Sequence, residues 1–332
     1  MSKKSYFGVN GVARNVKSWP VGIGNVSRKS KSGYFGVGGV ARQFLSGVDP
    51  VLNNNDWATI RAVSDAGQGA NYWSVGDTKT ITINGTVGTL SLSNLSVYVF
   101  ILGFDHNSSV EGSNRIHFQI GKISSKLIGL IDGSYSASRT DGSKIFNMNH
   151  WDNNNYGGWA GCDLRYDVLG STDVAPSGYG SAVTTSRVGY NASATCATNP
   201  VANTLMAALP ADLRAVMKGV TKYADAVGNS SNVLANVKAF TDYLFLLAEF
   251  EVRGTRSYAN QYEQNYQKQY AYYSAGNSKV MYRHSATGSK AMWWLRSAGY
   301  DYSNVFCAVY NDGSAIGDFA QGSYALAPGF VV

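Results

Sequence analysis

A short pattern recurs three times near the N-terminus, and its size limits what this part of the chain can form. YFGVNGVAR at residues 6–14 returns as YFGVGGVAR at residues 34–42, and a weaker copy, PVGIGNVSR, lies at residues 20–28. Each copy is a short apolar stretch, a Gly or Asn turn, a second short stretch and a closing Arg, which predicts a two-stranded hairpin. A unit this small cannot bury a core of its own. We therefore expect residues 1–47 to form an arm for attachment or oligomerisation, whose hairpins pack on one another, on another copy of the chain or on a partner.

The positive charge of the chain is concentrated in this arm. The net charge is +7, with eight Lys or Arg residues and no acidic residue before residue 48, whereas the remainder holds 20 basic and 21 acidic residues. A basic arm can contact nucleic acid, an acidic protein surface or a membrane surface. Because the basicity belongs to the attachment repeats and not to the main part of the chain, we expect no nucleic acid as a partner.

From residue 50 onward the sequence is typical of a strand-rich globular domain. The chain is rich in Gly (37) and Tyr (22) and poor in Pro (6), which favours tightly turned strands over a helix bundle. Residues 78–87 predict a hairpin that turns at Asn84-Gly85. Residues 97–102 predict a central strand buried on both faces, and residues 115–120 alternate like a half-buried strand. The alternation places His117 on the polar face, so we expect a surface histidine.

Helical spacing occurs in two segments. After Pro210, apolar side chains recur at helical spacing, and the last of them is Val220. This spacing predicts a helix that begins at Pro210. Four tyrosines recur every four residues from Tyr258 to Tyr270, which predicts a helix packed on the sheet through an aromatic stripe. The apolar run at residues 240–250 predicts core. With the strands, these segments indicate an α+β domain over residues 50–332.

Residues 143–181 are rich in Asn, Gly and Trp and poor in aliphatic side chains. Long loops in compact domains are usually either functional or disordered. We expect an ordered loop that is held in place by Trp151 and Trp159.

The sequence contains none of the common catalytic motifs. The four histidines show no HxxxH or HxH pairing, and no GxSxG or Walker A motif is present. Cys162 or Cys307 could in principle pair with a distant histidine as a nucleophile, but a buried free cysteine is the commoner state. Three cysteines without CxxC spacing indicate neither a disulfide framework nor a zinc site. We expect a protein without enzymatic activity.

Two Asn-rich segments, 53–56 (NNND) and 152–155 (DNNN), contain oxygens of the kind that bind calcium. Turn chemistry explains the same residues equally well. We therefore expect no cofactor, with calcium as the alternative.

The N-terminus is positively charged but lacks the apolar stretch of a secretory signal, and the longest apolar run, at residues 97–103, is too short to span a membrane. These features predict synthesis in a cytosol and no insertion into a membrane.

The C-terminal block carries a set of ordered motifs. WWLRS at residues 293–297 is followed by a DG turn at 312–313 and by APGF at 327–330. Upstream lie GWAGCDLR at 158–165, LPADL at 209–213 and LFLLAEFE at 244–251. Together these motifs resemble an uncharacterised domain family of bacterial, prophage and phage proteins, and the resemblance covers about residues 50–332. The family usually has Pro where this chain has Ala298, and Arg where it has Ala327.

The resemblance implies a C-type-lectin-like fold, the scaffold shared with formylglycine-generating enzymes. The catalytic cysteine pair of those enzymes has no counterpart here, so the resemblance does not imply their activity. The GVGGVAR repeats resemble those at the front of phage tail or virion-surface proteins.

The same fold is found in the variable proteins of diversity-generating retroelements, which vary in their C-terminal segment. The resemblance implies a recognition face within residues 297–326, above a core of Trp293, Trp294 and Leu295. Ordinary polar loops are the alternative explanation for this stretch. The implied contact residues are Tyr300, Asp301, Tyr302, Ser303, Asn304, Tyr310, Asn311, Asp312, Asp318, Phe319, Gln321 and Tyr324.

These expectations combine into a phage receptor-binding protein of the tail fibre or tail tip. It would be made in the bacterial cytoplasm, lie on the virion surface as a homotrimer, and bind a host-surface glycan or protein. A structural capsid or baseplate decoration protein without a specific ligand is the alternative.

Overall fold

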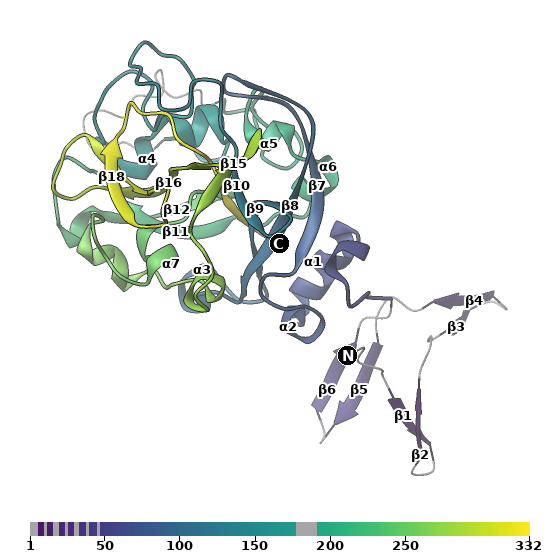
Figure 1. The fold of residues 1–332 in the computed structure, drawn as a ribbon. Helices are drawn as coiled ribbons and strands as arrows, with labels where there is room; N and C mark the ends of the chain where they lie inside the picture. Colours follow the sequence, from purple (N-terminus) through teal and green to yellow (C-terminus); the bar gives the residue numbers. More distant parts are fainter. Residues whose placement is uncertain are drawn as a thin grey trace.

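The structure is a computed structural model that describes the strands within residues 6–44 together with residues 47–176 and 191–332. The fold is mixed α+β, with three sheets in the main part of the chain and few, short helices (Figure 1). The α+β class predicted from the sequence is confirmed. Among the described residues, no helix is both long and apolar enough to cross a membrane.

The three copies of the N-terminal repeat are three antiparallel hairpins. Their registers are equivalent, because an apolar residue lies opposite the closing arginine in each: Phe7 with Arg14, Val21 with Arg28 and Phe35 with Arg42. The predicted strands are therefore present, while the role of the arm stays a prediction. The strands are β1 (Tyr6–Val9), β2 (Val12–Asn15), β3 (Pro20–Ile23), β4 (Val26–Lys29), β5 (Gly33–Val37) and β6 (Val40–Phe44).

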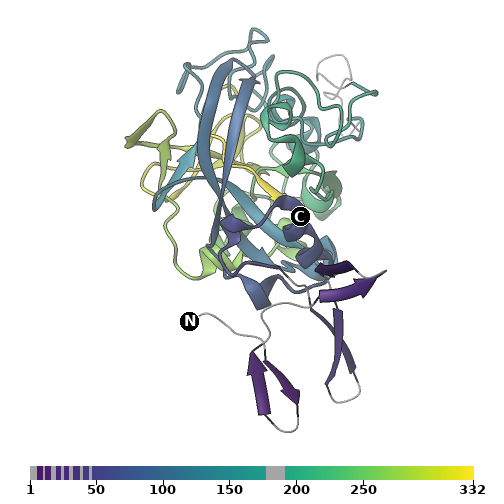
Figure 2. The ribbon, with the colours of Figure 1, turned by 90° about the vertical axis from the view of Figure 1, so that its right-hand side faces the viewer.

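The largest sheet has eight strands, which are antiparallel except where β10 pairs with β14. Its centre is β9, which pairs with β8, β10 and β19, while β8 also pairs with β7 at the edge of the sheet. Figure 2 shows β7 and β8 crossing the molecule as one long hairpin, beside the short helices of residues 205–214. The strands are β7 (Thr78–Val87), β8 (Leu90–Phe104), β9 (Ile116–Ile123), β10 (Lys126–Gly129), β13 (Leu244–Phe245), β14 (Met281–Arg283), β15 (Ala286–Ala291) and β19 (Gly329–Val331).

The buried central strand predicted at residues 97–102 is confirmed within β8, but two neighbouring predictions are wrong. Asn84-Gly85 forms a bulge inside β7, and the strand continues to bury Val87 before the chain turns at Gly88. At the turn, the Gly88 N–H donates to the Asn203 carbonyl at 2.9 Å, in a contact outside the hairpin. The second error concerns β9, whose first six residues are all buried because sheet and helices cover both of its faces. His117, on this strand, is therefore a core residue and not a surface histidine.

Two smaller sheets complete the main part. One pairs β11 (Val220–Asp225) with β12 (Val237–Asp242), and the other joins β16 (Trp293–Ala298), β17 (Val305–Val309) and β18 (Ala315–Phe319) in that order. Trp293, Trp294 and Leu295 are fully buried, as predicted. The indole N–H of Trp294 donates to the Phe146 carbonyl at 2.8 Å, which satisfies the one polar atom of this side chain. The predicted core run at residues 240–250 is also confirmed, since most of it is buried.

The helices are shorter than the apolar spacing predicted. After Pro210 only one turn forms, and Val220 begins β11 instead of ending a helix. No continuous helix joins Tyr258 to Tyr270: only residues 261–265 form a short helical segment, and the Tyr270 N–H, which a helix would direct to the Tyr266 carbonyl, bonds elsewhere. The Tyr258 N–H donates to the Glu249 carboxylate, and the Tyr270 N–H donates to the Glu251 carbonyl. The helical segments are η1 (Leu52–Asn54), α1 (Trp57–Asp65), α2 (Gly69–Tyr72), α3 (Ser108–Glu111), α4 (Gly158–Gly161), η2 (Leu164–Val168), α5 (Leu205–Ala208), α6 (Ala211–Arg214), η3 (Leu234–Asn236), α7 (Glu249–Arg253), η4 (Gln261–Asn265) and α8 (Ala271–Ser274).

Candidate recognition face

The three-stranded sheet β16–β17–β18 divides the expected contact residues between its two ends. Val305 lies opposite Phe319 at one end and Val309 opposite Ala315 at the other. The strand between them is about 14 Å long, at about 3.4 Å per residue. One end carries residues 300–304, Asp318, Phe319 and Gln321, and the other carries residues 310–312. Apart from Tyr324, the expected contact residues therefore fall into two groups, one at each end of the sheet.

The first end has the most exposed aromatic side chains. Tyr302 is 59% exposed and Phe319 is 51% exposed. Aromatic side chains are enriched in protein interfaces, so two exposed rings at one end of a sheet mark a candidate contact surface. This end of the sheet is therefore the better candidate for a contact surface.

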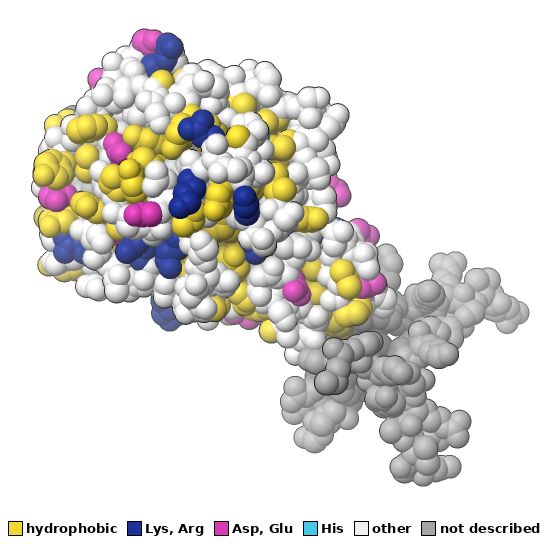
Figure 3. All heavy atoms as spheres, viewed as in Figure 1, with side chains coloured by type: hydrophobic (Ala, Val, Ile, Leu, Met, Phe, Trp, Pro, Cys, Tyr) yellow, Lys and Arg dark blue, Asp and Glu magenta, His cyan; other side chains and the backbone are white. Residues whose placement is uncertain are grey.

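A loop from a distant part of the sequence extends this surface. The N–H of Arg139 donates to the Gln321 carbonyl at 3.2 Å, and the N–H of Met148 donates to the Ala320 carbonyl at 2.8 Å. Two further exposed rings follow on the same loop, Trp151 at 48% and Tyr156 at 37%. We refer to Trp151, Tyr156, Tyr302 and Phe319 together as the aromatic end. Figure 3 shows hydrophobic side chains among polar ones on the side of the molecule where β18 lies.

Of these four residues, sequence reasoning had placed Trp151 in a structural role and had not considered Tyr156. The prediction that both tryptophans hold the loop is confirmed for Trp159, which is fully buried, and not for Trp151, which is exposed. The local sequence gives one signal for the difference. Trp151 lies among Asp and Asn residues, whereas Trp159 lies between Gly and Ala.

Asn155 joins the two loops. Its buried side-chain amide donates to three carbonyls of the β16–β17 loop, those of Gly299, Tyr302 and Val305, at 3.1, 2.9 and 2.9 Å. Its backbone N–H donates to the Ser303 carbonyl at 2.8 Å. The loop that carries Tyr302 is thus held from below by one side chain.

Asn155 was a calcium candidate in the sequence, together with residues 53–56. Its Oδ1 accepts the Asn229 N–H at 2.8 Å, the Oδ1 of Asn53 accepts the Thr80 N–H at 2.7 Å, and Asp56 caps α1 through the Thr59 N–H. These oxygens serve as acceptors for backbone N–H groups. The alternative interpretation, turn and cap chemistry, accounts for them.

Other expected contact residues support the face from within. The Arg256 guanidinium lies over the Tyr300 ring, 3.9 Å from the centroid of that ring. Tyr324 is packed edge-on against Trp294 at 4.8 Å, and burial raises the pKa of its hydroxyl. Asp301 is exposed, while Ser303, Asn304 and Gln321 are partly exposed.

The opposite end of the sheet is a separate surface. Tyr310 is exposed there, Asn311 is partly exposed, and the Asp312 carboxylate accepts the Ser314 N–H at 2.8 Å. Hydrogen bonds from Ser314 hold the pKa of Asp312 below its usual value. Arg253 donates to the Gly313 carbonyl at 3.2 Å, which joins this turn to α7.

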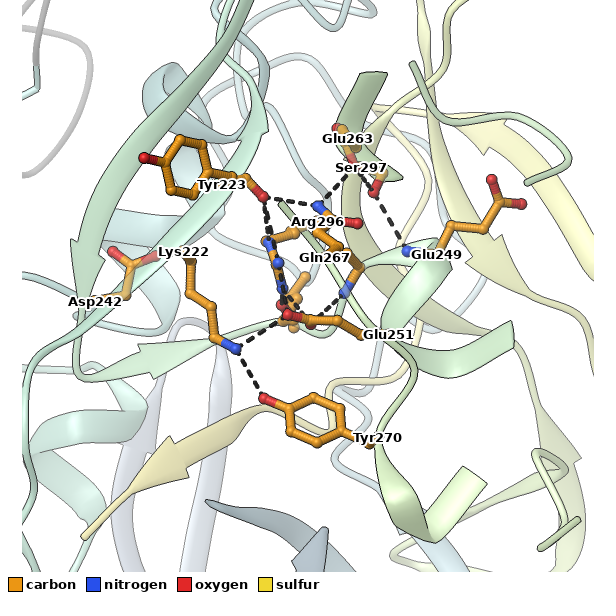
Figure 4. A network of polar contacts seen from close by, with 12 residues as sticks. Lys222, Tyr223, Asp242, Glu249, Glu251, Glu263, Gln267, Tyr270, Arg296 and Ser297 are labelled. Atoms are coloured by element: carbon orange, nitrogen blue, oxygen red, sulfur yellow. Dashed lines mark hydrogen bonds and ion pairs between the residues drawn. The ribbon is translucent and has the colours of Figure 1, made fainter. Parts of the chain in front are cut away.

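A buried polar network anchors β16, the strand that leads into the aromatic end (Figure 4). Each donor group of Arg296 has an acceptor: the Glu251 carboxylate takes two bonds, and the carbonyls of Leu246 and Tyr223 take the others. Bidentate arginine–carboxylate contacts of this kind combine strength with a fixed geometry. The Arg of the WWLRS motif therefore fixes the position of its strand.

The residue after Arg296 continues the network. The Ser297 hydroxyl lies 2.6 Å from Glu263 Oε2 and accepts the Glu249 N–H at 3.3 Å. The Glu249 carboxylate in turn accepts the N–H groups of Tyr258 and Ala259, which lie beside residues 299–300. The base of the β16–β17 loop is thus held by buried carboxylates.

The ionisation of these buried groups depends on their neighbours. Burial alone would raise the pKa of Glu251, but Arg296 and Lys222 hold it below its usual value. Burial raises the pKa of Glu263 to about 7 and lowers the pKa of His106 to about 3. At neutral pH, Glu251 is therefore a carboxylate and His106 is a neutral imidazole.

His106, Glu111 and Glu251 place their ligand atoms within 4.8 Å of one another, which is compatible with a metal ion. However, the Lys222 ammonium lies 2.6 Å from Glu111 Oε2 and 3.0 Å from Glu251 Oε1. The positive charge that these carboxylates need is thus supplied by the chain itself. We assign a structural role to this cluster, which also contacts His117 through Glu111.

Comparison with known proteins gives one match. Residues 143–332 match a family described as a domain of unknown function (DUF6273). The match includes β16–β18, Asn155 and the aromatic end. No curated protein matches the chain, and neither does any solved structure.

Proposed function

The chain belongs to the DUF6273 family, whose function is unknown, and we propose that it is a phage virion protein of the tail that binds a receptor on the host cell. In this proposal the aromatic end contacts a surface glycan or protein of the host. Residues 1–47 attach the protein to other tail or baseplate proteins, and the chain forms a homotrimer on the virion surface after synthesis in the bacterial cytoplasm.

The observation that carries the proposal is that exposed aromatic rings lie on a strand and a loop that buried hydrogen bonds hold in place. Tyr302 and Phe319 extend into solvent, while the strand and loop behind them are held by Arg296 and Asn155. Rigid aromatic side chains lose little conformational entropy on binding, so they are efficient contact residues. The buried titratable groups are engaged in holding this base, which favours binding over catalysis.

The arm supports attachment. Its three hairpins have equivalent registers, and isolated two-stranded hairpins are marginally stable at best in water. An arm of this kind gains stability when it docks on a partner or on other copies of the chain. Its positive charge favours an acidic docking surface.

We further propose a C-type-lectin-like arrangement for the main part and sequence variation at its exposed C-terminal positions. Antiparallel strands with long loops over a buried WWLRS strand are compatible with that fold. Exposed loop residues such as Asp301 and Tyr302 tolerate replacement, because no core packing depends on them.

The test is binding of the fluorescently labelled full chain to a panel of bacterial strains. Replacing Tyr302 and Phe319 by Ala should reduce binding at least tenfold without changing the melting temperature. Tyr310→Ala is the matched control, because Tyr310 is exposed on the same sheet at its other end.

Two outcomes would contradict the proposal. If the wild-type chain binds no strain, or if the double variant binds like wild type, the aromatic end is not a receptor site. Retention on particles tests the arm separately: deleting residues 1–47 should release the protein. Particles that keep full infectivity with the double variant would favour the structural alternative.

A further inference from the structure

The side chain of Trp151 packs on the backbone of a glycine in the same loop. A Cβ atom on Gly142 would lie 2.4–2.8 Å from three atoms of the Trp151 six-membered ring, so the ring packs directly on the glycine backbone. Gly142 has a φ of +81° and donates its N–H to the His150 carbonyl at 2.9 Å. The indole is nevertheless 48% exposed. It is therefore a supported ring that remains open to solvent.

The surroundings of Trp151 are polar. Arg139 and Asp141 form an exposed ion pair at 3.3 Å on the same loop, and the Asn154 side chain accepts the Tyr156 N–H at 3.2 Å. The rings of the aromatic end have polar neighbours in the chain: Asp152 and residues 153–155, all Asn, separate Trp151 from Tyr156, and Asp301 and Ser303 flank Tyr302. A protein-binding surface usually has a contiguous apolar core. Separate rings among hydrogen-bonding groups suit a ligand with alternating apolar and hydroxyl patches.

Sugar rings have this pattern, since their C–H groups stack on the electron-rich face of an aromatic ring while their hydroxyls bond to polar neighbours. The charge of this surface further restricts the chemical class of the ligand. Four carboxylates lie at this end, those of Asp141, Asp152, Asp301 and Asp318, against three cations, Arg139, Lys144 and Arg256. The surface therefore has no excess of positive charge, which favours a neutral polysaccharide over one that carries phosphate or uronate groups.

We infer that Trp151 is a stacking platform for a sugar ring of a neutral polysaccharide, and that the recognition face extends from residues 299–324 onto residues 139–156. This inference rests on the proposed receptor-binding function and names the chemical class of the ligand. Tyr302 and Phe319 supply further contacts of this face to the polysaccharide.

Tryptophan fluorescence can report on this site selectively. Trp57, Trp73, Trp159, Trp293 and Trp294 are at most 3% exposed, and among the described tryptophans only Trp151 is open to solvent. Trp19 lies outside the described residues, so a Trp19→Phe background removes its signal. In that background, acrylamide quenching should come almost entirely from Trp151.

The probe is polysaccharide extracted from a strain that the labelled chain binds. It should shield the Trp19→Phe chain from acrylamide, and Trp151→Phe in the same background should abolish the shielded signal. Trp151→Ala should weaken binding at least tenfold at an unchanged melting temperature, while Tyr310→Ala binds normally. Binding should also be insensitive to salt, because no ion pair with the ligand forms.

Several results would overturn the inference while leaving the receptor-binding function intact. One is undiminished binding by Trp151→Ala when the Tyr302 and Phe319 variant fails to bind. Another is binding that survives periodate oxidation of the cells but is lost after protease treatment, which identifies a protein ligand. A steep fall of binding with salt would indicate a charged ligand. Absence of binding to every strain would instead contradict the proposed function itself.

Discussion

Arg296 and Glu251 form a buried two-bond ion pair, with Nη1 at 2.5 Å from Oε2 and Nη2 at 2.8 Å from Oε1. Neither side chain is exposed to solvent. The pair joins β16 to α7, and Glu251 also accepts a bond from the Lys222 ammonium. One carboxylate therefore balances two buried cations, with help from Glu111.

Neutralising this carboxylate should destabilise the fold strongly. Glu251→Gln keeps the shape of the side chain but leaves Arg296 and Lys222 without a full counter-charge. Breaking a buried pair in this way costs about 3–5 kcal/mol. Urea unfolding of the purified chain measures the loss.

Asp65→Asn is the control for that experiment. Asp65 is half-exposed, and its carboxylate pairs with Arg61 at 2.8 Å and with Lys218 at 2.7 Å. Because solvent reaches this carboxylate and screens both pairs, their loss should cost about 1–2 kcal/mol, less than the loss of the buried pair. Equal costs for the two substitutions would show that the Arg296–Glu251 pair contributes no more than a surface pair.

Asn155 should determine the order of the loop that carries Tyr302. Asn155→Ala removes the amide that bonds to the carbonyls of Gly299, Tyr302 and Val305, and we expect it to cost about 3 kcal/mol, because buried carbonyls lose their donors. Asn155→Asp should cost more, since a carboxylate would face three carbonyl oxygens. Amide hydrogen exchange across residues 299–305 should accelerate at least tenfold in both variants.

The neighbouring Asn154 supplies the comparison for this test. Its side chain accepts only the Tyr156 N–H among the bonds described, so Asn154→Ala should leave exchange in residues 299–305 unchanged. If Asn155→Ala also leaves it unchanged, other contacts hold the loop.

The sequence predicted the apolar part of the fold better than the polar part. It identified the buried strand at residues 97–102 and the buried side chains of residues 293–295. These predictions succeeded because a run of apolar residues is usually buried in the core. The same reasoning failed for His117, because alternation cannot distinguish a polar residue in solvent from one that has a buried partner.

The network behind the aromatic end could not be predicted for a related reason. Lys222 lies 29 residues from Glu251 and 111 residues from Glu111, so no local spacing signals the contacts. The exposed position of Trp151 likewise depends on Gly142, on another turn of the loop. The resemblance implied a contact region in residues 297–326, and the face that we propose also includes Trp151 and Tyr156, which lie on a loop distant in the sequence.

Gly158 should be irreplaceable within the GWAGCDLR motif. Its φ is +51°, and a Cβ there would lie 1.9 Å from the Asp225 carbonyl oxygen, which β11 holds in place. Gly158→Ala should therefore cost at least about 3 kcal/mol through overpacking and backbone strain. Gly133→Ala is the matched control, since nothing lies within 4 Å of its added methyl group. Thermal melting should separate the two variants, and similar melting temperatures would show that β11 can move aside.

Glu263 should make stability fall as the pH rises through the weakly acidic range. Its pKa is raised by burial from 4.5 to about 7, so the folded state holds a proton that the unfolded state releases. A raised pKa contributes stability that is complete below pH 4.5 and is lost as the pH rises towards 7 and beyond. The shift corresponds to a change of about 3 kcal/mol. His106 acts in the opposite direction, since its lowered pKa of about 3 contributes stability that is present above pH 6.5 and is lost as the pH falls.

The two contributions separate when wild type is compared with Glu263→Gln. The variant cannot ionise at this position, and it retains His106 and Glu111, so their effects cancel in the difference. Urea unfolding at pH 5 and pH 8 should show that the stability of wild type relative to Glu263→Gln is higher at pH 5. The substitution also weakens the contacts of residue 263 with Ser297 and with the Asp225 N–H. Because glutamine does not titrate, this loss is the same at both pH values and does not produce a pH-dependent difference. A difference that is constant from pH 5 to pH 8 would mean that Glu263 keeps one ionisation state over this range, and the ionisation assigned to it would then be wrong.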